Sequence, residues 1–147
     1  DISRWLLGEE FVRGIVNAVG SGDPMLITLE TDGGHLVSTE LFLNADYGYH
    51  VHAELVCTKG TVALAQPALF VSNGQGRHGY GFPENWVPRF AEAYRRQLDA
   101  FVRFASNGFN EGATAWDGYV ATAIAEQLVP ALVERRPAVF QLADRPN

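Results

Sequence analysis

The stretch MLITLETDGGHLVSTELFLN, residues 25–44, decides the fold class of this chain. Two runs rich in apolar and β-branched residues, Met25–Thr31 and His35–Asn44, flank the tripeptide Asp32-Gly33-Gly34. The tight turns that join antiparallel strands need a positive φ, which glycine adopts without a steric penalty. The stretch therefore predicts a β-hairpin.

Short runs separated by turn residues predict further strands on both sides of this hairpin. Phe11–Ala18 precedes it, whereas Tyr49–Thr58, Thr61–Ala65 and Ala68–Asn73 follow. In Tyr49–Thr58 small or apolar residues alternate with polar ones, as expected for a strand with one face against a core. The glycine-rich segment Asn73–Pro83 is predicted to be a loop.

The second half of the chain changes to a helical period. Apolar residues recur at three- and four-residue spacing from Phe90 to Ala105, and Gly108 follows the last of them. A second long helix is predicted over Ala115–Glu134, because Thr114 and Asp117 approximate a capping box. Ser3–Leu7 reads as the last turns of a helix, and Ala138–Leu142 as an edge strand. The predicted fold class is α+β, a largely antiparallel open sheet with two long helices packed on one face.

The other face of this sheet allows two interpretations. A tight turn between His35–Asn44 and Tyr49–Thr58 would set Glu40 near Glu54 on the face away from the helices, with His52 beside them. Such a face could be solvated surface. We favour a subunit interface, because a face of mixed polarity is rarely left bare on a large sheet.

Composition excludes several classes of protein. The chain has 147 residues, of which 47% are apolar and 19% charged, and this is a globular rather than a disordered composition. No apolar stretch approaches the roughly 20 residues of a membrane span. A net charge of −6 disfavours binding to nucleic acid. A single cysteine, Cys57, and no recognisable signal peptide predict the cytoplasm, and a start at Asp1 with Met25 as the only methionine predicts a piece of a longer protein.

Motifs for catalysis or metal binding are weak. His50, His52 and Glu54 share one strand face with Glu40 placed opposite, but any strand with polar outward residues has this spacing, so solvated or interface histidines are favoured over a metal site. Neither a nucleophile elbow nor a dinucleotide-binding glycine pattern is present. We therefore predict no catalytic, cofactor or metal site within these residues. Tyr49 and Tyr94 could bind a ligand or pack locally.

Several pieces of the sequence, taken in order, carry a family resemblance. They are Thr39-Glu40-Leu41-Phe42, Asn44-Ala45-Asp46-Tyr47-Gly48-Tyr49, Ala53-Glu54-Leu55-Val56, Lys59-Gly60-Thr61-Val62, Arg89-Phe90 with Ala93-Tyr94, and Trp116-Asp117-Gly118-Tyr119. In this order and spacing the chain resembles, over essentially its whole length, the C-terminal domain of the glucose-fructose oxidoreductase/inositol dehydrogenase (Gfo/Idh/MocA) family. The Tyr-Gly-Tyr and Trp-Asp-Gly-Tyr pieces are most similar to myo-inositol 2-dehydrogenases.

The resemblance implies that residues 1–147 form a single C-terminal domain for substrate binding and oligomerisation. The parent protein would oxidise a secondary alcohol of a cyclic polyol or sugar, with NAD or NADP bound mainly by an N-terminal Rossmann domain that is absent from this chain. The catalytic lysine and an Asp-x-x-x-His motif would lie upstream, the motif directly before Asp1, so the isolated chain is expected to be inactive. The open sheet would form a dimer or tetramer interface.

The resemblance also implies site residues. Tyr49 matches a tyrosine near the bound polyol, and Tyr94 matches another that reaches the same pocket. Ser3 falls where these enzymes often carry an aspartate, and His52 where arginine is frequent. The shorter serine leaves inositol and a related polyol or sugar both open as substrates. The alternative function is a non-catalytic oligomerisation or binding module derived from the family, which would self-associate through the face carrying Glu40, His52 and Glu54.

Overall fold

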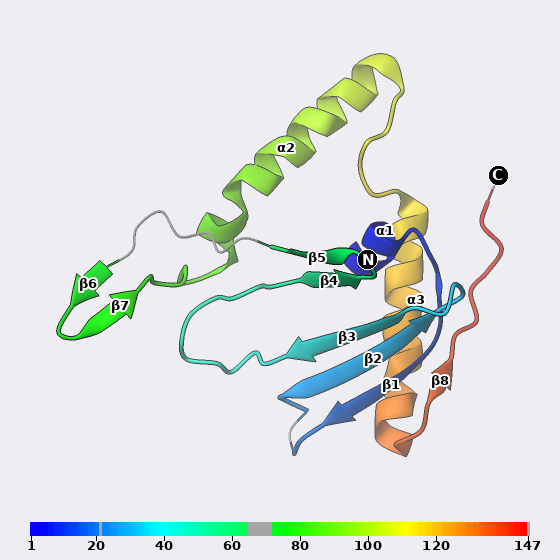
Figure 1. The fold of residues 1–147 in the computed structure, drawn as a ribbon. Coiled ribbons are helices and arrows are strands. Elements are labelled where there is room, and N and C mark those ends of the chain that lie inside the picture. Colours follow the sequence, from blue (N-terminus) through cyan, green and yellow to red (C-terminus); the bar gives the residue numbers. More distant parts are fainter. Residues whose placement is uncertain (21, 65–71, 147) are drawn as a thin grey trace. The chain divides into compact units, whose positions relative to one another are not determined.

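The computed structural model describes residues 1–20, 22–64 and 72–146, which fold into two compact units (Figure 1). Unit 1 comprises Asp1–Asn44 and Asn110–Asn147, and unit 2 comprises Ala45–Phe109. Unit 2 is thus an insertion between the strands of unit 1 and its long helix. Each unit is described by itself.

A four-stranded antiparallel sheet forms the frame of unit 1. Its order is β3 (Leu36–Leu41), β2 (Met25–Thr31), β1 (Phe11–Ala18) and β8 (Ala138–Val139). In β2 and β3, Leu29 pairs with Val37 and Ile27 with Thr39, which confirms the hairpin predicted around Asp32-Gly33-Gly34. The C-terminal segment returns to pair with β1, as predicted for an edge strand, although it is shorter than expected.

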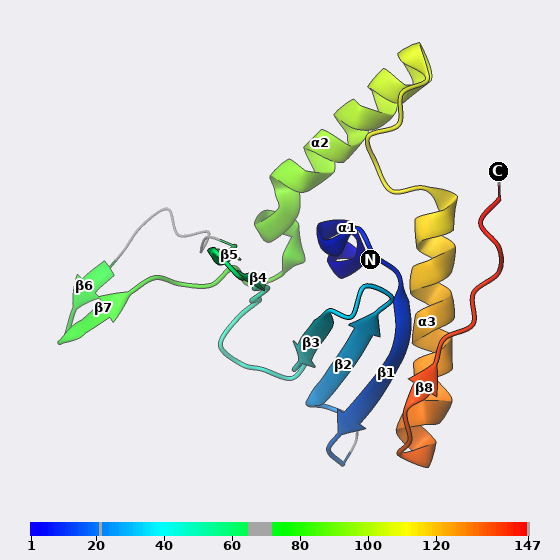
Figure 2. The same cartoon turned by 45° about the vertical axis from the view of Figure 1, so that its right-hand side comes forward.

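Helix α3 (Ala115–Glu134) lies along one face of this sheet (Figure 2). It buries a stripe at helical spacing, Val120, Ile124, Leu128 and Ala131, against apolar side chains that come mostly from β1, β2 and the C-terminal segment. Within the sheet, the Leu29 side chain of β2 fills the space beside Gly14 of β1, where a Cβ atom would lie 2.6 Å from Leu29 Cδ2. The contact between α3 and the sheet is the core of unit 1.

The opposite face of the sheet carries no buried residue, and we call it the open face. Strand alternation and register assign to it Arg13, Ile15, Asn17, Leu26, Thr28, Glu30, Leu36, Ser38 and Glu40. Apolar and polar residues are mixed there, and Leu36 is 73% exposed. The predicted α+β class, with an antiparallel open sheet and two long helices, is confirmed.

In unit 1, hydrogen bonds explain where one helix and one strand end. Helix α1 (Ile2–Leu7) ends at Gly8, whose φ of 69° allows its N–H to reach the Arg4 carbonyl oxygen at 2.8 Å. Strand β3 ends at Leu41, three residues earlier than predicted. The Asp23 carboxylate accepts the backbone N–H groups of Leu43 and Asn44 at 2.9 and 3.0 Å, which removes these donors from strand pairing.

Unit 2 contains two short antiparallel hairpins and helix α2 (Trp86–Asn107). The hairpins are β4 (Glu54–Cys57) with β5 (Gly60–Ala63), and β6 (Ser72–Gly74) with β7 (Arg77–Gly79). The β6–β7 hairpin lies in the segment predicted as a loop, so that prediction was wrong there. Most of the strand predicted over Ala68–Asn73 lies outside the described residues.

The predicted hairpin between His35–Asn44 and Tyr49–Thr58 is wrong. In the described part of the chain β3 pairs with β2, which sets Glu40 opposite Leu26, and β4 pairs with β5, which sets Glu54 opposite Ala63. The second predicted strand is also shorter, because it begins only at Glu54. The alternating pattern before Glu54 reflects a different arrangement, in which the Tyr49 N–H donates to the Pro83 carbonyl oxygen at 2.8 Å.

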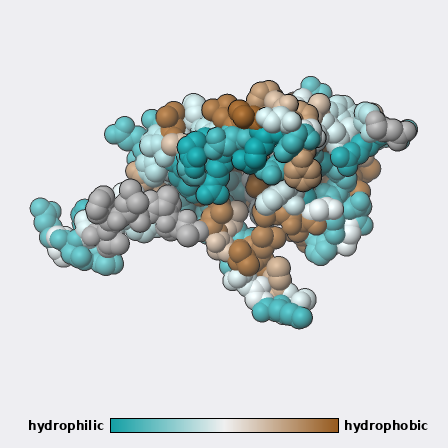
Figure 3. Space-filling view, turned by 90° about the horizontal axis from the view of Figure 1, so that it is seen from above, coloured by the Kyte–Doolittle hydropathy of each residue, from teal (hydrophilic) through white to brown (hydrophobic). Residues whose placement is uncertain are grey.

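Helix α2 differs from α3 in burial. None of its residues is buried, although it carries large apolar side chains such as Leu98 and Phe101. Figure 3 shows hydrophobic residues (brown) at the surface of the chain, next to hydrophilic ones (teal). Packing on one face of the sheet is therefore observed for α3 and stays a prediction for α2. No helix in the described ranges is long and apolar enough to cross a membrane.

Candidate functional site

Tyr49 is held in unit 2 by its backbone and by its ring. Besides the hydrogen bond to Pro83, its ring meets that of Phe90 edge-on, with centroids 6.2 Å apart and an interplanar angle of 87°. Phe90 belongs to α2, at the point where its backbone departs from helical geometry. The tyrosine is therefore fixed against the beginning of a helix, and edge-on aromatic pairs of this kind are favourable.

The glycine of the Tyr47-Gly48-Tyr49 piece has a structural cause. Gly48 has a φ of +112°, which residues with a Cβ atom rarely adopt. A Cβ atom there would also lie 2.8 Å from the Cβ atom of Phe82. Only glycine lets the chain turn this closely past Phe82 and deliver Tyr49 to Phe90.

Tyr94 lies on the same helix, four residues after Phe90, and its ring meets that of Trp86 at 5.7 Å. Its side chain is about half exposed. The structure thus places both predicted tyrosines at the N-terminal part of α2, next to aromatic partners. Sequence reasoning did not identify Phe90 and Trp86 as these partners, because helical apolar spacing by itself indicates only a packed face.

A second aromatic cluster lies beside the Tyr47-Gly48-Tyr49 turn. His50 contacts Phe82 with centroids 4.8 Å apart, and it stacks on His52 at 6.2 Å with an interplanar angle of 21°. His52 therefore stacks on the ring of His50. Within the part of the chain that the structure describes, no group of three or more His, Cys, Asp or Glu side chains could hold a metal ion.

The predicted interface residues fall into different units. Glu40 is exposed on the open face of unit 1, whereas His52 and Glu54 are exposed in unit 2. No strand pairing joins them in the described residues, so the contact between Glu40 and Glu54 that the sequence predicted is not formed by pairing. The open face itself nevertheless exists as predicted.

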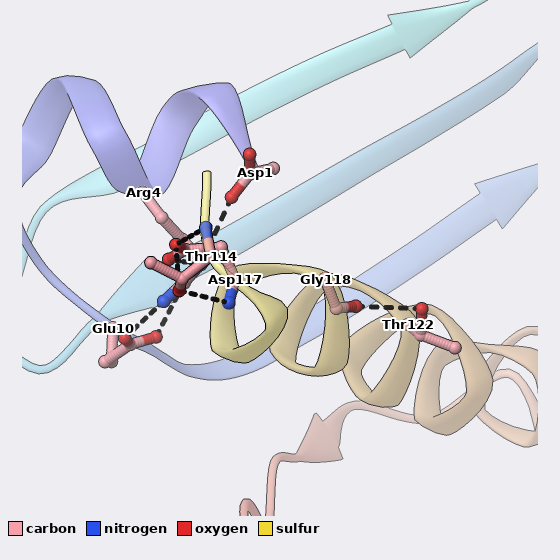
Figure 4. A network of polar contacts seen from close by, with 7 residues as sticks. All are labelled: Asp1, Arg4, Glu10, Thr114, Asp117, Gly118 and Thr122. Carbon is pink, nitrogen blue, oxygen red and sulfur yellow. Dashed lines mark hydrogen bonds and ion pairs between the residues drawn. The ribbon is translucent and has the colours of Figure 1, made fainter. Parts of the chain in front are cut away.

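Ser3 lies on α1, half-buried, directly before the buried residue Arg4. The Arg4 guanidinium donates to both carboxylate oxygens of Glu10, at 2.7 and 2.5 Å, in a bidentate pair. Its Nη1 also lies 3.2 Å from Asp1 Oδ1 and 3.4 Å from Asp117 Oδ1 (Figure 4). We call these four residues the Arg4 network.

Asp117 joins the Arg4 network to the start of α3. Its Oδ2 accepts hydrogen bonds from the backbone N–H and the hydroxyl of Thr114, at 2.7 and 2.6 Å, and its own N–H donates to the Thr114 hydroxyl. This is the capping box that the sequence predicted. The Thr114 hydrogen bonds, followed by the Arg4 guanidinium, hold the pKa of Asp117 below its usual range.

Sequence reasoning missed the Arg4 network. Arg4 and Asp117 are 113 residues apart, so no local spacing could have paired them. The nearest signal was an arginine in a short apolar helix that is followed by two glutamates.

Comparison with known proteins identifies the family. The family model described as "Oxidoreductase family, C-terminal alpha/beta domain", of the Gfo/Idh/MocA group, matches residues 1–139. The chain belongs to this family, and it corresponds to the C-terminal domain.

Two relatives to which the chain is similar are both named inositol 2-dehydrogenases. Inositol 2-dehydrogenase 1 of Saccharopolyspora erythraea is 44% identical over 99% of this chain and 46% of its own length. Inositol 2-dehydrogenase of Streptomyces avermitilis is 34% identical over the whole chain and 45% of its own length. The chain therefore spans about half the length of the curated relatives it matches.

Solved structures have the same fold. A myo-inositol dehydrogenase from Lactobacillus casei, in complex with NAD(H) and myo-inositol, superposes with a TM-score of 0.89 at 24% identity and covers 98% of this chain and 46% of its own. A scyllo-inositol dehydrogenase from the same organism gives 0.86 at 23% identity, over 94% of this chain and 44% of its own. At these identities the structural likeness shows the fold.

Proposed function

We propose that this chain is the C-terminal part of a dehydrogenase that oxidises a secondary hydroxyl of inositol, or of a related cyclic polyol or sugar. The observation that carries the proposal is the 44% identity, along 99% of the chain, to a protein named inositol 2-dehydrogenase. An identity of this size along nearly the whole chain supports a shared substrate class more strongly than fold alone.

The chemistry divides between the two halves of such an enzyme. Bound NAD or NADP would accept the hydride, and the half beyond this chain would supply most of the cofactor site and the lysine and histidine that handle the hydroxyl proton. NAD is favoured as the cofactor because a structural relative contains NAD(H). The residues of this chain would bind and orient the polyol.

On the family resemblance, three side chains are each proposed to contact the polyol: Tyr49, Tyr94 and Ser3. Each carries a hydroxyl that can both donate and accept a hydrogen bond, which suits a ligand whose hydroxyls also do both. Their fixed surroundings support this role, because Tyr49 rests on Phe90 and Tyr94 on Trp86. With serine at position 3, one neutral oxygen stands in place of the two charged oxygens of a carboxylate, so discrimination among polyols should differ from that of enzymes with aspartate there.

Self-association through the open face is the second part of the proposal. The face mixes exposed Leu36 and Leu26 with charged residues that include Glu40, a composition that suits contact with a second copy of the chain. His52 and Glu54 are proposed to take part from unit 2. The free and exposed thiol of Cys57 agrees with a reducing compartment, and we propose the cytoplasm.

The test is an assay of the complete natural polypeptide that contains this chain. We expect reduction of NAD+ in the presence of myo-inositol, scyllo-inositol or a related cyclic polyol, and none with residues 1–147 alone. If the complete protein is folded and yet oxidises no alcohol with either NAD+ or NADP+, the dehydrogenase proposal is overturned. The alternative, a non-catalytic oligomerisation or binding module, would then remain.

A single substitution tests the tyrosines. Tyr94→Phe removes one hydroxyl without changing the ring, so the KM for the polyol should rise, or kcat fall, by about tenfold. The matched control is Tyr80→Phe, another exposed tyrosine of unit 2, which packs on Phe82 and should change either parameter less than about twofold. Unchanged kinetics of Tyr94→Phe across the polyols would remove Tyr94 from the site.

A further inference from the structure

Helix α1 is attached to unit 1 in an unusual way. It has six residues, too few for a helix to be stable by its own hydrogen bonds. Its large apolar residues Ile2 and Trp5 are 63% and 74% exposed, whereas Arg4 is its only buried residue. A charged side chain, rather than an apolar one, therefore occupies the place where a short helix is normally anchored.

The contacts of Arg4 set the orientation of the helix. A bidentate pair with Glu10 defines the plane of the guanidinium, since both of its N–H···O bonds must be aligned together. The Nη1 contact to Asp117 then relates that plane to the beginning of α3. One side chain thus joins α1, the segment that leads into β1, and α3.

Burial makes this arrangement exacting. A guanidinium that is 7% exposed must keep its partners, because an unpaired buried charge is strongly unfavourable. The Glu10 hydrogen bonds accordingly raise the pKa of Arg4 above its usual range. Asp117 cannot move freely toward α1 either, since its other oxygen is occupied by the Thr114 cap.

We propose that Arg4 is a positioning residue that fixes the orientation of α1 and thereby places Ser3 against the polyol. This inference rests on the proposed function, in which Ser3 contacts the substrate. Arg4 itself touches no substrate atom in this proposal. Lysine could replace the charge but not the bidentate geometry, because an ammonium group is a point donor without a planar fork.

The experiment compares Arg4→Lys with Arg95→Lys in the complete protein. Arg95 also binds a glutamate through two N–H groups and contacts a second carboxylate, Asp99, but it is exposed on α2. We expect Arg4→Lys to raise the KM for the polyol about five- to tenfold and to leave the KM for NAD+ within about twofold, because a small displacement of a positioned group weakens only the contacts that it makes. Arg95→Lys should leave both constants unchanged.

A second comparison separates positioning from stability. Leu128→Ala opens the core of unit 1 far from α1, so it should lower Tm at least as much as Arg4→Lys without changing the polyol KM. Asp117→Asn should raise the polyol KM as Arg4→Lys does, and the effect of the double variant should be smaller than the sum of the two single effects, because both changes act on the same network of contacts. A polyol KM that follows Tm across all these variants would mean that Arg4 is merely structural.

The outcomes for the two proposals are distinct. If the unaltered protein oxidises no polyol, the proposed function fails and Arg4 has no substrate to position. If it does so and Arg4→Lys keeps the polyol KM within about twofold, the dehydrogenase stands and the inference on Arg4 is overturned.

Discussion

The two units of this chain differ in how far their apolar side chains are buried. In the described part of the chain every buried apolar residue belongs to unit 1, where α3 lies on the sheet. Unit 2 has a helix of similar length that also carries large apolar side chains, yet none of α2 is buried. Long helices with apolar side chains therefore play two roles here, one as a core element and one as a surface that carries aromatic side chains.

An apolar pattern therefore has a different structural meaning in each of the two units. In unit 1 apolar residues on α3 meet apolar residues of the sheet, so burial stabilises the unit. In unit 2 the aromatic rings of Tyr49, Phe90, Trp86 and Tyr94 pair locally and remain near the surface. Substitutions in the core of unit 1 should accordingly affect stability strongly, whereas substitutions of exposed apolar residues on α2 should affect it little.

Truncation of one leucine in each long helix should give the largest difference between the two units. Leu128→Ala in α3 should reduce the free energy of unfolding by about 2–5 kcal/mol, because it leaves a cavity in the core. Leu98→Ala in α2, where the side chain is 66% exposed, should change it by less than about 0.5 kcal/mol. Urea unfolding of the 147-residue chain, followed by circular dichroism, measures both. Equal effects would show that the two helices are buried alike.

Gly48→Ala tests whether unit 2 depends on a local turn rather than on a core. The added Cβ atom meets Phe82 and forces an unfavourable positive φ, so we expect a loss of about 1–3 kcal/mol. Gly76→Ala is the matched control, because Gly76 also has a positive φ but has open space around it. Thermal unfolding should therefore show the larger decrease in Tm for Gly48→Ala. Identical decreases would mean that the contact with Phe82 is irrelevant.

Acid unfolding tests how much Asp117, a member of the Arg4 network, contributes to the stability of unit 1. The pKa of folded Asp117 is lower than that of the unfolded chain, so its contribution to stability is complete above its ordinary pKa, about 4, and is lost as pH falls through the folded value. Asp117→Asn should thus be destabilised at pH 7, and its difference from the unaltered chain should shrink below about pH 4. Denaturant titrations at several pH values measure this, and a difference that is constant with pH would contradict it.

The smallest effect is expected from the ion pairs on the surface of α2. Arg95 and Arg96 lower the pKa of Glu92 to about 2, yet its side chain is exposed. Glu92→Gln should therefore lower Tm only slightly, and the change should disappear in about 1 M salt, where exposed charges are screened. A large decrease that persists in high salt would mean that this side of α2 is covered.

Local chemistry explains which elements could be predicted. The boundaries of β1, β2 and α3 follow directly from alternation, from the Asp32-Gly33-Gly34 turn and from the Thr114 capping box. The failures share a different cause, because hydrogen bonds between distant segments ended or replaced the predicted strands. Asp23 ends β3 by binding Leu43 and Asn44, and Pro83 accepts the N–H of Tyr49.

The candidate site divides in the same way. The tyrosines and Ser3 were found from a resemblance carried by short pieces of sequence, whereas only the folded chain shows that Phe90 and Trp86 are the aromatic partners of the two tyrosines. The alternating pattern near His52 predicted a strand face, and the structure instead stacks this ring on His50. Alternation of polar and apolar residues does not distinguish a strand from an extended segment whose backbone groups form hydrogen bonds outside a sheet.

From its sequence alone this chain is an α+β domain with an antiparallel hairpin, a capped long helix and the sequence pieces of the Gfo/Idh/MocA C-terminal domain. These features depend on backbone preferences and spacing within about ten residues, which a sequence displays directly. Only the tertiary structure decided that β3 pairs with β2 alone in the described residues, that α2 keeps its apolar residues at the surface, and that Arg4 reaches Asp117. Contacts between residues far apart in the chain depend on how whole elements pack, and no local pattern encodes that choice.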